Sequence, residues 1–199
     1  MLVYVATKNE GKFRELASIF AGSPHDVALY PEYADVEEGE ESFADNALLK
    51  ARALRAQLDA AGVMGAVIAD DSGLCIDALD GRPGVLSARY AGANATWERR
   101  RRSLLHEIKD VPDEKRGAVF ICYMPLILAD GRTWMGEGFA RGTIAREERG
   151  AGGFGYDPIF IPDGQTQTYS EMGEEKKNSM SHRRRAADAL LESCGTLLY

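Results

Sequence analysis

The chain has few cysteines and no long apolar run, and both scarcities narrow its class. Its 199 residues include three cysteines, Cys75, Cys122 and Cys194, without any Cys-x-x-Cys pair. This odd number predicts neither a disulfide framework nor a zinc site, and reduced thiols fit the cytoplasm. No apolar run approaches the ~18 residues of a membrane-spanning helix, and the first residues lack the charged leader of a signal peptide. We therefore expect a cytoplasmic protein without membrane contact.

A net positive charge is also missing. The formal net charge is -7 at pH 7, whereas a general nucleic-acid binder usually has a basic surface. We expect no nucleic-acid partner, and any anionic ligand must meet a local basic patch. The chain is rich in apolar residues (45%) and has no repeat, linker or low-complexity segment. It is long enough to bury a large core, which predicts a single domain over residues 1–199.

The stretch with the clearest candidates for catalysis or ligand binding is residues 66–73, where a short apolar run ends at Asp70, Asp71, Ser72 and Gly73. Four small or β-branched apolar residues suit a strand that is covered on both faces. Ligands in α/β proteins collect beyond the carboxyl ends of such strands. Side chains alternate along a strand, so Asp70 and Asp71 should point to opposite faces. A plain turn is the alternative, because Asp, Ser and Gly are also turn residues.

A second polar loop follows the apolar residues 2–7, which are predicted to form a strand. It carries Thr7, Asn9 and Lys12 just before a helix with Phe13 and Leu16 on its inner face. Free backbone N–H groups at a helix N-terminus favour phosphate. The Gly-x-x-x-x-Gly-Lys-Ser/Thr pattern of a P-loop is absent. The alternative is helix capping by Asn9 with a solvated Lys12.

An acidic segment, residues 37–41, comes before the helix with the clearest signals. Ser42 and Asp45 resemble a capping box, and an apolar stripe follows that ends at Gly62. The stripe consists of Ala47, Ala51, Leu54, Leu58 and Ala61. The acidic segment reads as a solvated loop, and Arg52 and Arg55 lie off the stripe and are expected to be exposed.

Later segments predict a mixed sheet. Residues 118–128 and 132–144 flank Asp130-Gly131, a strong β-hairpin signal. Pro125 cannot donate to a β-ladder, so its strand is expected at an edge or with a bulge. Thr96 is expected to begin a helix whose run of arginines, residues 99–102, forms a solvated surface. Residues 160–161 should enter a strand, and the last helix should bury Ala186 and Leu190.

Two further segments have the composition of ligand contacts. Residues 150–158 combine four glycines with two aromatic residues and Asp157. An aromatic ring among glycines can stack on a base, although a flexible connection is the alternative. Residues 176–185 gather basic and titratable side chains in an otherwise acidic chain.

Six blocks, in order along nearly the whole chain, resemble the inosine triphosphate pyrophosphatases, also called XTP/dITP diphosphatases. The blocks are Thr7-x-Asn9-x-x-Lys12, Ser42-Phe43-x-x-Asn46-Ala47-x-x-Lys50-Ala51, Ala69-Asp70-Asp71-Ser72-Gly73-Leu74, Pro83-Gly84-x-x-Ser87-Ala88-Arg89-Tyr90, Gly153-Phe154-Gly155-Tyr156-Asp157-Pro158 and Ser181-His182-Arg183. The resemblance implies an α/β fold with a long mixed sheet flanked by helices, two lobes around a central cleft, and a homodimer. It also implies Mg²⁺-dependent hydrolysis of ITP, dITP or XTP to the monophosphate and pyrophosphate.

The resemblance also implies roles for individual residues. Asp71 would accept a proton and bind Mg²⁺, with Glu37, or failing it Glu38, as the second carboxylate and Asp70 in support. The substrate-binding residues would be Thr7, Lys8, Asn9, Glu10, Gly11, Lys12, Lys50, Ser72, Phe154, Gly155, Tyr156, Asp157, Lys177, His182 and Arg183. Phe154 would stack on the purine, and donors from Lys177, His182 and Arg183 would favour a purine with oxygen at C6.

Three residues depart from the family pattern. Arg184 and Asp80 stand at positions where glycine is common in the family, and Gln165 stands where lysine is frequent. Two alternatives to the implied reaction remain. One is a nucleotide-binding or sensing protein without turnover, and the other is a pyrophosphatase for other modified nucleotides.

Overall fold

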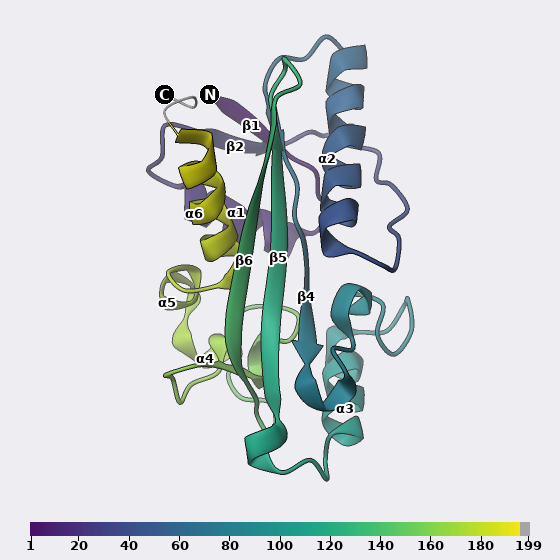
Figure 1. Cartoon of the computed structure of the whole chain (residues 1–199), viewed down its shortest axis with the longest axis vertical. Coiled ribbons are helices and arrows are strands. Elements are labelled where there is room, and N and C mark those ends of the chain that lie inside the picture. Colours follow the sequence, from purple (N-terminus) through teal and green to yellow (C-terminus); the bar gives the residue numbers. More distant parts are fainter. Residues whose placement is uncertain (196–199) are drawn as a thin grey trace. The chain divides into compact units, whose positions relative to one another are not determined.

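A computed structural model describes residues 1–195 (Figure 1). The strands are β1 (Leu2–Val5), β2 (Asp26–Leu29), β3 (Ala66–Ile68), β4 (Asp71–Ile76), β5 (Gly117–Ile127), β6 (Thr133–Ile144) and β7 (Phe160–Pro162). The helices are α1 (Glu10–Phe20), α2 (Phe43–Ala60), α3 (Trp97–Glu107), α4 (Tyr169–Met172), α5 (Glu174–Asn178) and α6 (His182–Cys194). Within the described residues the strands follow the order β2-β1-β3-β5-β6-β7, with β4 beside β5. β1 is parallel to β2 and β3, while β3–β5 and β6–β7 are antiparallel. The predicted mixed sheet flanked by helices is confirmed.

The chain divides into two compact units. Unit 1 comprises Met1–Asp71, Cys122–Gly138 and the segment that begins at His182, and unit 2 comprises Ser72–Ile121 and Phe139–Ser181. The backbone passes between the units within β4, β5 and β6 and again after Ser181. The single domain predicted over residues 1–199 stays a prediction.

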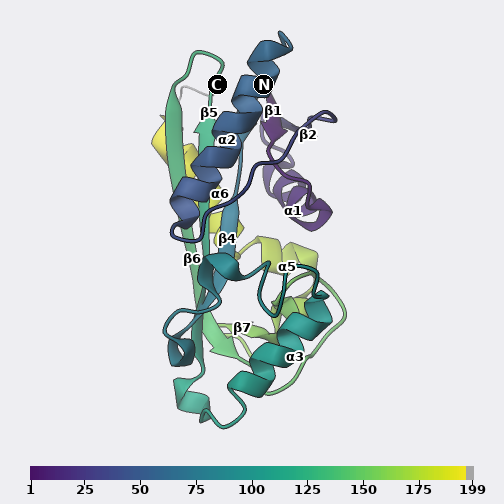
Figure 2. The ribbon, with the colours of Figure 1, turned by 90° about the vertical axis from the view of Figure 1, so that its right-hand side faces the viewer.

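Alternation along β3 builds the two cores of unit 1. Ala66 and Ile68 pack in one core with α1 and α6, whereas Val67 and Ala69 pack in another with α2. All four are at most 1% exposed, as expected for a strand that is covered on both faces. Figure 2 shows α2 and α1 with the strands of this unit. The carboxyl end of β3 therefore emerges between helices that can meet it from both faces.

Unit 2 has a core of its own. Leu74 and Ile76 of β4 are fully buried with Leu104 of α3, and Phe120 and Phe160 pack with their ring centroids 4.7 Å apart. Thr96 caps α3 by accepting from the Arg99 N–H, as predicted.

The prediction of a solvated arginine run fails at Arg100, which is 5% exposed. Its guanidinium donates to the carbonyls of Gly92, Ala93 and Ala95 and lies over the Trp97 ring. All three carbonyls belong to the loop before α3, and the hydrogen bonds that they accept hold the arginine inward.

The turn alternative for Asp70 to Gly73 is wrong, because β4 begins at Asp71. Of the two alternatives predicted for Pro125, an edge strand or a bulge, the edge strand is excluded, since β5 lies between β3 and β6. The pairing of Ile68 with Leu126 places Pro125 opposite Ala69, where β3 has ended and β4 has not begun. A residue without an N–H is tolerated at such an interruption of the ladder.

α2 begins as predicted, with Ser42 accepting from the Asp45 N–H. The exposure expected for Arg55 is wrong. This side chain donates to the carbonyls of Gly65 and Val63 at 2.6 and 3.2 Å and pairs with Asp59. It thereby satisfies backbone acceptors in the turn after the helix. Ala61, placed on the buried stripe, is exposed, because the helix has ended at Ala60.

Two short helices, α4 and α5, were not predicted. They have four and five residues, too few for an apolar period to show. A signal for α4 was nevertheless available, since Thr168 and Glu171 form a capping box. Asp80, one of the three departures from the family pattern, adopts a left-handed φ of 51°, which aspartate tolerates better than most residues.

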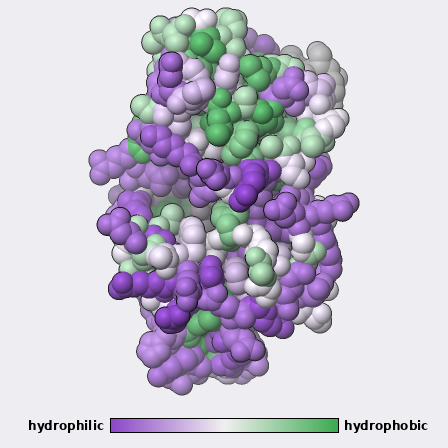
Figure 3. All heavy atoms as spheres, turned by 180° about the vertical axis from the view of Figure 1, so that it is seen from behind, coloured by the Kyte–Doolittle hydropathy of each residue, from purple (hydrophilic) through white to green (hydrophobic). Residues whose placement is uncertain are grey.

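The surface seen in Figure 3 is largely polar, with apolar side chains gathered over part of unit 1. The exposed large apolar residues of this unit are Met1, Leu2, Leu29, Leu49 and Met64. Among residues 1–195, no helix combines the length and the apolarity that crossing a membrane requires.

Candidate active site

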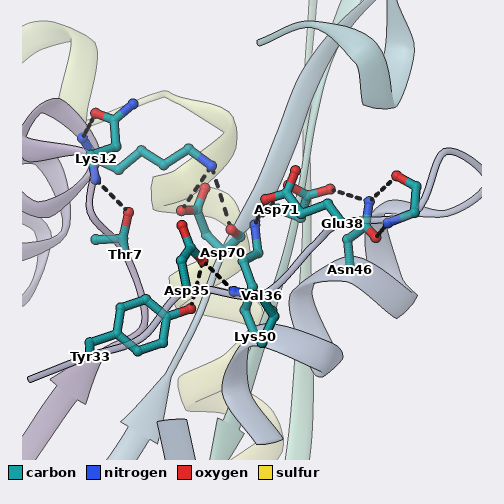
Figure 4. A network of polar contacts seen from close by, with 12 residues as sticks. Thr7, Lys12, Tyr33, Asp35, Val36, Glu38, Asn46, Lys50, Asp70 and Asp71 are labelled. Atoms are coloured by element: carbon teal, nitrogen blue, oxygen red, sulfur yellow. Dashed lines mark hydrogen bonds and ion pairs between the residues drawn. The ribbon is translucent and has the colours of Figure 1, made fainter. Parts of the chain in front are cut away.

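The start of α1 presents the first cluster of polar groups. Asn9 caps the helix by accepting from the Lys12 N–H at 3.1 Å, and its own N–H donates to Thr7 Oγ1. The capping role considered for Asn9 is thus confirmed. Lys12 is not simply solvated, because its ammonium lies 3.3 Å from Asp70 Oδ1 and 3.5 Å from the Asp70 carbonyl (Figure 4). The cation of the first polar loop therefore reaches the end of β3.

Asp70 belongs to a chain of alternating charges. Arg183 donates from Nε to Asp70 Oδ2 at 3.1 Å and from Nη1 to Glu15 Oε2 at 2.6 Å. Asp70 and Arg183 are 1% and 3% exposed. Burial by itself lowers the pKa of Arg183, but Asp70 and Glu15 raise it above the usual range. The order Glu15, Arg183, Asp70, Lys12 gives each buried charge an opposite neighbour, as buried ions require.

Asp71 points to a different set of partners on α2. Its Oδ1 accepts from Lys50 Nζ at 2.9 Å, and its Oδ2 accepts from Asn46 Nδ2 at 3.3 Å (Figure 4). The same ammonium also lies 2.9 Å from Glu38 Oε1. Adjacent residues thus send their carboxylates to different helices, as the alternation of side chains predicts.

The environment of Asp71 changes its acidity. Burial raises the pKa of this carboxyl above its usual range, and the ammonium groups of Lys50 and Lys12 offset only part of that effect. Burial lowers the pKa of Lys50, but the nearby carboxylates, Asp71 first, raise it above the usual range. A carboxylate with a raised pKa beside a lysine that stays charged is suited to accept a proton.

The oxygen donors here fit Mg²⁺, which the resemblance implies. Among residues 1–195, no group of three or more His, Cys, Asp and Glu side chains could hold a metal ion. Mg²⁺ keeps several waters and often takes only one or two protein carboxylates plus phosphate oxygens. Glu37 is exposed, whereas Glu38 is half-buried and shares the Lys50 ammonium with Asp71. The arrangement of this loop therefore favours Glu38 as the second carboxylate.

Unit 2 holds the predicted aromatic group. Asp157 Oδ2 accepts from the Phe154 N–H at 2.8 Å and pairs with Lys177 Nζ at 2.5 Å. The same ammonium lies 4.9 Å from the centre of the Phe154 ring. Gly153 has a φ of +73°, and a Cβ there would collide with the Asp157 carboxylate. Asp157 and Lys177 thus fix the loop that carries Phe154.

The predicted site residues are divided between the two units. Unit 1 contains Thr7, Lys8, Asn9, Glu10, Gly11, Lys12, Glu37, Lys50, Asp71, His182 and Arg183. Unit 2 contains Ser72, Phe154, Gly155, Tyr156, Asp157 and Lys177. Tyr156 is 2% exposed, donates to the Ser87 carbonyl and meets the Trp97 ring edge-on, so its side chain packs inside unit 2. Lys8 and Glu10 are exposed at the start of α1.

Two residues of these networks, Asn46 and Glu15, were not singled out as site residues. A signal existed for each. Asn46 precedes Lys50 by four residues, and Glu15 follows Lys12 by three. These spacings place each pair on one helix face.

Comparison with known proteins identifies the family. The model of the Ham1 family matches residues 3–193. The chain belongs to the Ham1 family. Among its Ham1 relatives, the dITP/XTP pyrophosphatase of Streptomyces coelicolor is 46% identical and covers 98% of this chain and 97% of its own length. The dITP/XTP pyrophosphatase of Opitutus terrae is 43% identical, with 96% and 98% covered.

Solved structures of Ham1 proteins agree with the fold. A HAM1 protein from Coxiella burnetii has a TM-score of 0.82 at 35% identity and covers 100% of this chain and 98% of its own. The nucleoside-triphosphatase, or dITP/XTP pyrophosphatase, from Mycobacterium abscessus has a TM-score of 0.72 at 42% identity, with 96% and 99% covered. The resemblance inferred from the six sequence blocks is confirmed.

Proposed function

We propose that this member of the Ham1 family hydrolyses dITP, XTP and ITP to the nucleoside monophosphate and pyrophosphate. The observation that carries the proposal is the placement of Lys12 and Lys50 on either side of adjacent buried aspartates at the end of β3. Two fixed cations suit a triphosphate, and a carboxylate with a raised pKa suits the activation of water. The names of the Streptomyces and Opitutus relatives supply the substrate class.

In the proposed mechanism, Asp71 accepts a proton from water as the oxygen attacks the α-phosphorus. A new P–O bond forms there, the bond from the α-phosphorus to the bridging oxygen breaks, and pyrophosphate leaves. Lys12 and Lys50, with Thr7 and Asn9, hold the phosphates and stabilise the charge that develops on the leaving group. Because these groups are positioned before the substrate arrives, little reorganisation is required during the reaction.

Mg²⁺ is the proposed cofactor. Asp71 would hold it together with Glu38, or with Glu37 as first predicted, and the ion would polarise phosphate oxygens as a Lewis acid. A cytoplasmic location and a homodimer are also proposed, both from the resemblance to the pyrophosphatases.

Base recognition is proposed to depend on Phe154, which would stack on the purine. Lys177, His182 and Arg183 would favour a base with oxygen at C6, since a donor that meets the amino group of adenine stays unpaired. Lys177 and Arg183 also contact carboxylates, Asp157 and Asp70. Ser72, Gly155, Tyr156 and Asp157 complete the proposed contacts.

The product distinguishes this reaction from stepwise dephosphorylation. Incubation with dITP and Mg²⁺ should release pyrophosphate without free orthophosphate, and oxygen from labelled water should enter the monophosphate. dITP, ITP and XTP should be preferred over ATP. Mass spectrometry of both products and a panel of nucleotides measure these outcomes. Label in pyrophosphate would contradict attack at the α-phosphorus, and binding without turnover would favour the sensing alternative.

The raised pKa of Asp71 predicts an acid limit to activity. Protonation removes the base, so kcat/KM should fall as the pH falls through the pKa of this carboxyl. Burial raises that pKa in the metal-free protein, whereas a bound cation would lower it, so the midpoint of the profile should move to lower pH as the Mg²⁺ concentration rises. pH profiles of kcat/KM for dITP at limiting and at saturating Mg²⁺ measure this shift. A midpoint that does not move would contradict Asp71 as both the base and a metal ligand.

A further inference from the structure

Two side chains of α2, Gln57 and Asn46, hold the preceding loop through the same pair of hydrogen bonds. The Gln57 carboxamide accepts from the Ala34 N–H and donates to the Ala34 carbonyl, both at 2.8 Å. The Asn46 carboxamide accepts from the Gly39 N–H at 2.8 Å and donates to the Gly39 carbonyl at 3.1 Å. Each side chain thus binds both backbone groups of one loop residue. Residues 35–38 of the acidic loop, which include Glu38, lie between these two attachments.

The two attachments differ in one respect. Asn46 Nδ2 also lies 3.3 Å from Asp71 Oδ2, and Asn46 is only 3% exposed. A primary carboxamide has two N–H donors and one carbonyl acceptor. Asn46 therefore binds Gly39 of the acidic loop through both ends of its amide group, and it donates to Asp71 from the amide nitrogen. Gln57 offers a natural comparison, because it makes the same pair of loop contacts about three helical turns away.

These contacts close a ring of interactions. Lys50, four residues after Asn46, binds Glu38 and Asp71, and Glu38 is the residue before Gly39. Going round the ring, Asn46 holds Gly39, the backbone leads to Glu38, Lys50 bridges Glu38 to Asp71, and Asp71 returns to Asn46. Lys50 supplies a charge, but its side chain is long and flexible. The Asn46 side chain is shorter, and it holds the loop through hydrogen bonds to the backbone of Gly39.

We propose that Asn46 is a positioning residue, which sets the placement of Glu38 relative to Asp71. The inference rests on the proposed function. Asn46 touches neither water nor substrate in the proposed mechanism, and it acts by holding the loop and one oxygen of Asp71. Loss of this group should lower kcat while KM, set mainly by the triphosphate and base contacts, changes little.

The test compares Asn46→Ala with Gln57→Ala in the full chain, with dITP as substrate. Loss of residues that orient ligands typically costs about 10- to 100-fold in activity, and we expect a fall of this size in kcat for Asn46→Ala. Gln57→Ala removes the same type of loop contact far along α2 and should stay within about two-fold, as most surface changes do. Asn46→Asp keeps the acceptor for Gly39 but loses both donors, so it should fall at least as far. Circular dichroism and thermal melting check that each variant folds, and Asn46→Ser replaces Asn46→Ala if that variant does not.

A double-mutant cycle with Glu38→Gln distinguishes the positioning of Glu38 from a purely structural role of Asn46. If Asn46 acts by placing Glu38, the double variant should be little worse than Glu38→Gln alone. Losses that multiply independently, or a kcat for Asn46→Ala equal to that of Gln57→Ala, would overturn the inference. Failure of the wild-type protein to release pyrophosphate from dITP would instead overturn the proposed function, and this inference with it.

Discussion

Asp71→Asn should abolish most turnover while the chain still folds. The substitution keeps the shape of the side chain but removes the charge and the proton acceptor. General-base catalysis is typically worth about 10²- to 10⁴-fold in rate, and we expect a loss of kcat in this range. An amide has one acceptor oxygen, so one of the two donors, Lys50 or Asn46, loses its partner. The local cost in stability should be about 1 kcal/mol.

The control for this variant is Asp59→Asn, on the exposed side of α2. Asp59 pairs with Arg55 at 2.8 Å, and its side chain is 60% exposed. Removal of such a surface carboxylate should leave kcat unchanged within about two-fold. Steady-state rates with dITP at saturating Mg²⁺ measure both variants, and chemical denaturation measures their stability. An Asp71→Asn variant with near-native kcat would rule out this aspartate as the base.

Arg183→Met should cause the largest loss of stability among the substitutions considered. The side chain is 4% exposed and lies between Glu15 and Asp70, whose side chains are 10% and 0% exposed. Removal of one member of a buried ion pair leaves an uncompensated charge and typically costs about 3 to 5 kcal/mol. For a chain of this length, such a loss should lower the melting temperature on the order of 10 °C. Asp70 keeps its contact with Lys12 in this variant. Adding Glu15→Gln removes the charge of the other carboxylate that has lost Arg183, and it should restore part of the stability.

Arg184→Met is the matched control on the same helix. Arg184 pairs with Asp188 one turn away, and the two side chains are 39% and 46% exposed. Exposed pairs at this spacing contribute about 0.3 to 0.5 kcal/mol, so its melting temperature should change little. Kinetics then separate two roles of Arg183. A loss of kcat/KM on dITP and ATP alike favours the charge network, whereas a loss on dITP alone favours contact with the base. Equal melting temperatures for the two variants would contradict the buried network.

The sequence predicted those features that depend on local pattern. The continuous apolar run of residues 66–69 predicted a strand covered on both faces, and the caps of α1, α2 and α3 at Asn9, Ser42 and Thr96 were readable as short motifs. Local pattern also predicted that the carboxylates of Asp70 and Asp71 would diverge.

The partners of those carboxylates could not be predicted in the same way. Arg183 meets Asp70 across 113 positions of the chain, and only tertiary packing decides such a contact. Arg55 and Arg100 were expected at the surface because charge is usually solvated, but both instead satisfy backbone carbonyls. The acceptors that hold them belong to loops whose paths the sequence pattern does not specify.

The divergence of Asp70 and Asp71 makes chain length at this junction critical. β3 ends at Ile68 and β4 begins at Asp71, so only two residues determine which carboxylate faces α2 and which faces Arg183. Insertion of one residue here would exchange the two faces and offer each helix the wrong partner. Both acids would be retained in such a variant, yet each would meet the other's cation. Alleles with a one-codon insertion between Ile68 and Asp70 should therefore be inactive even though every named side chain is still encoded.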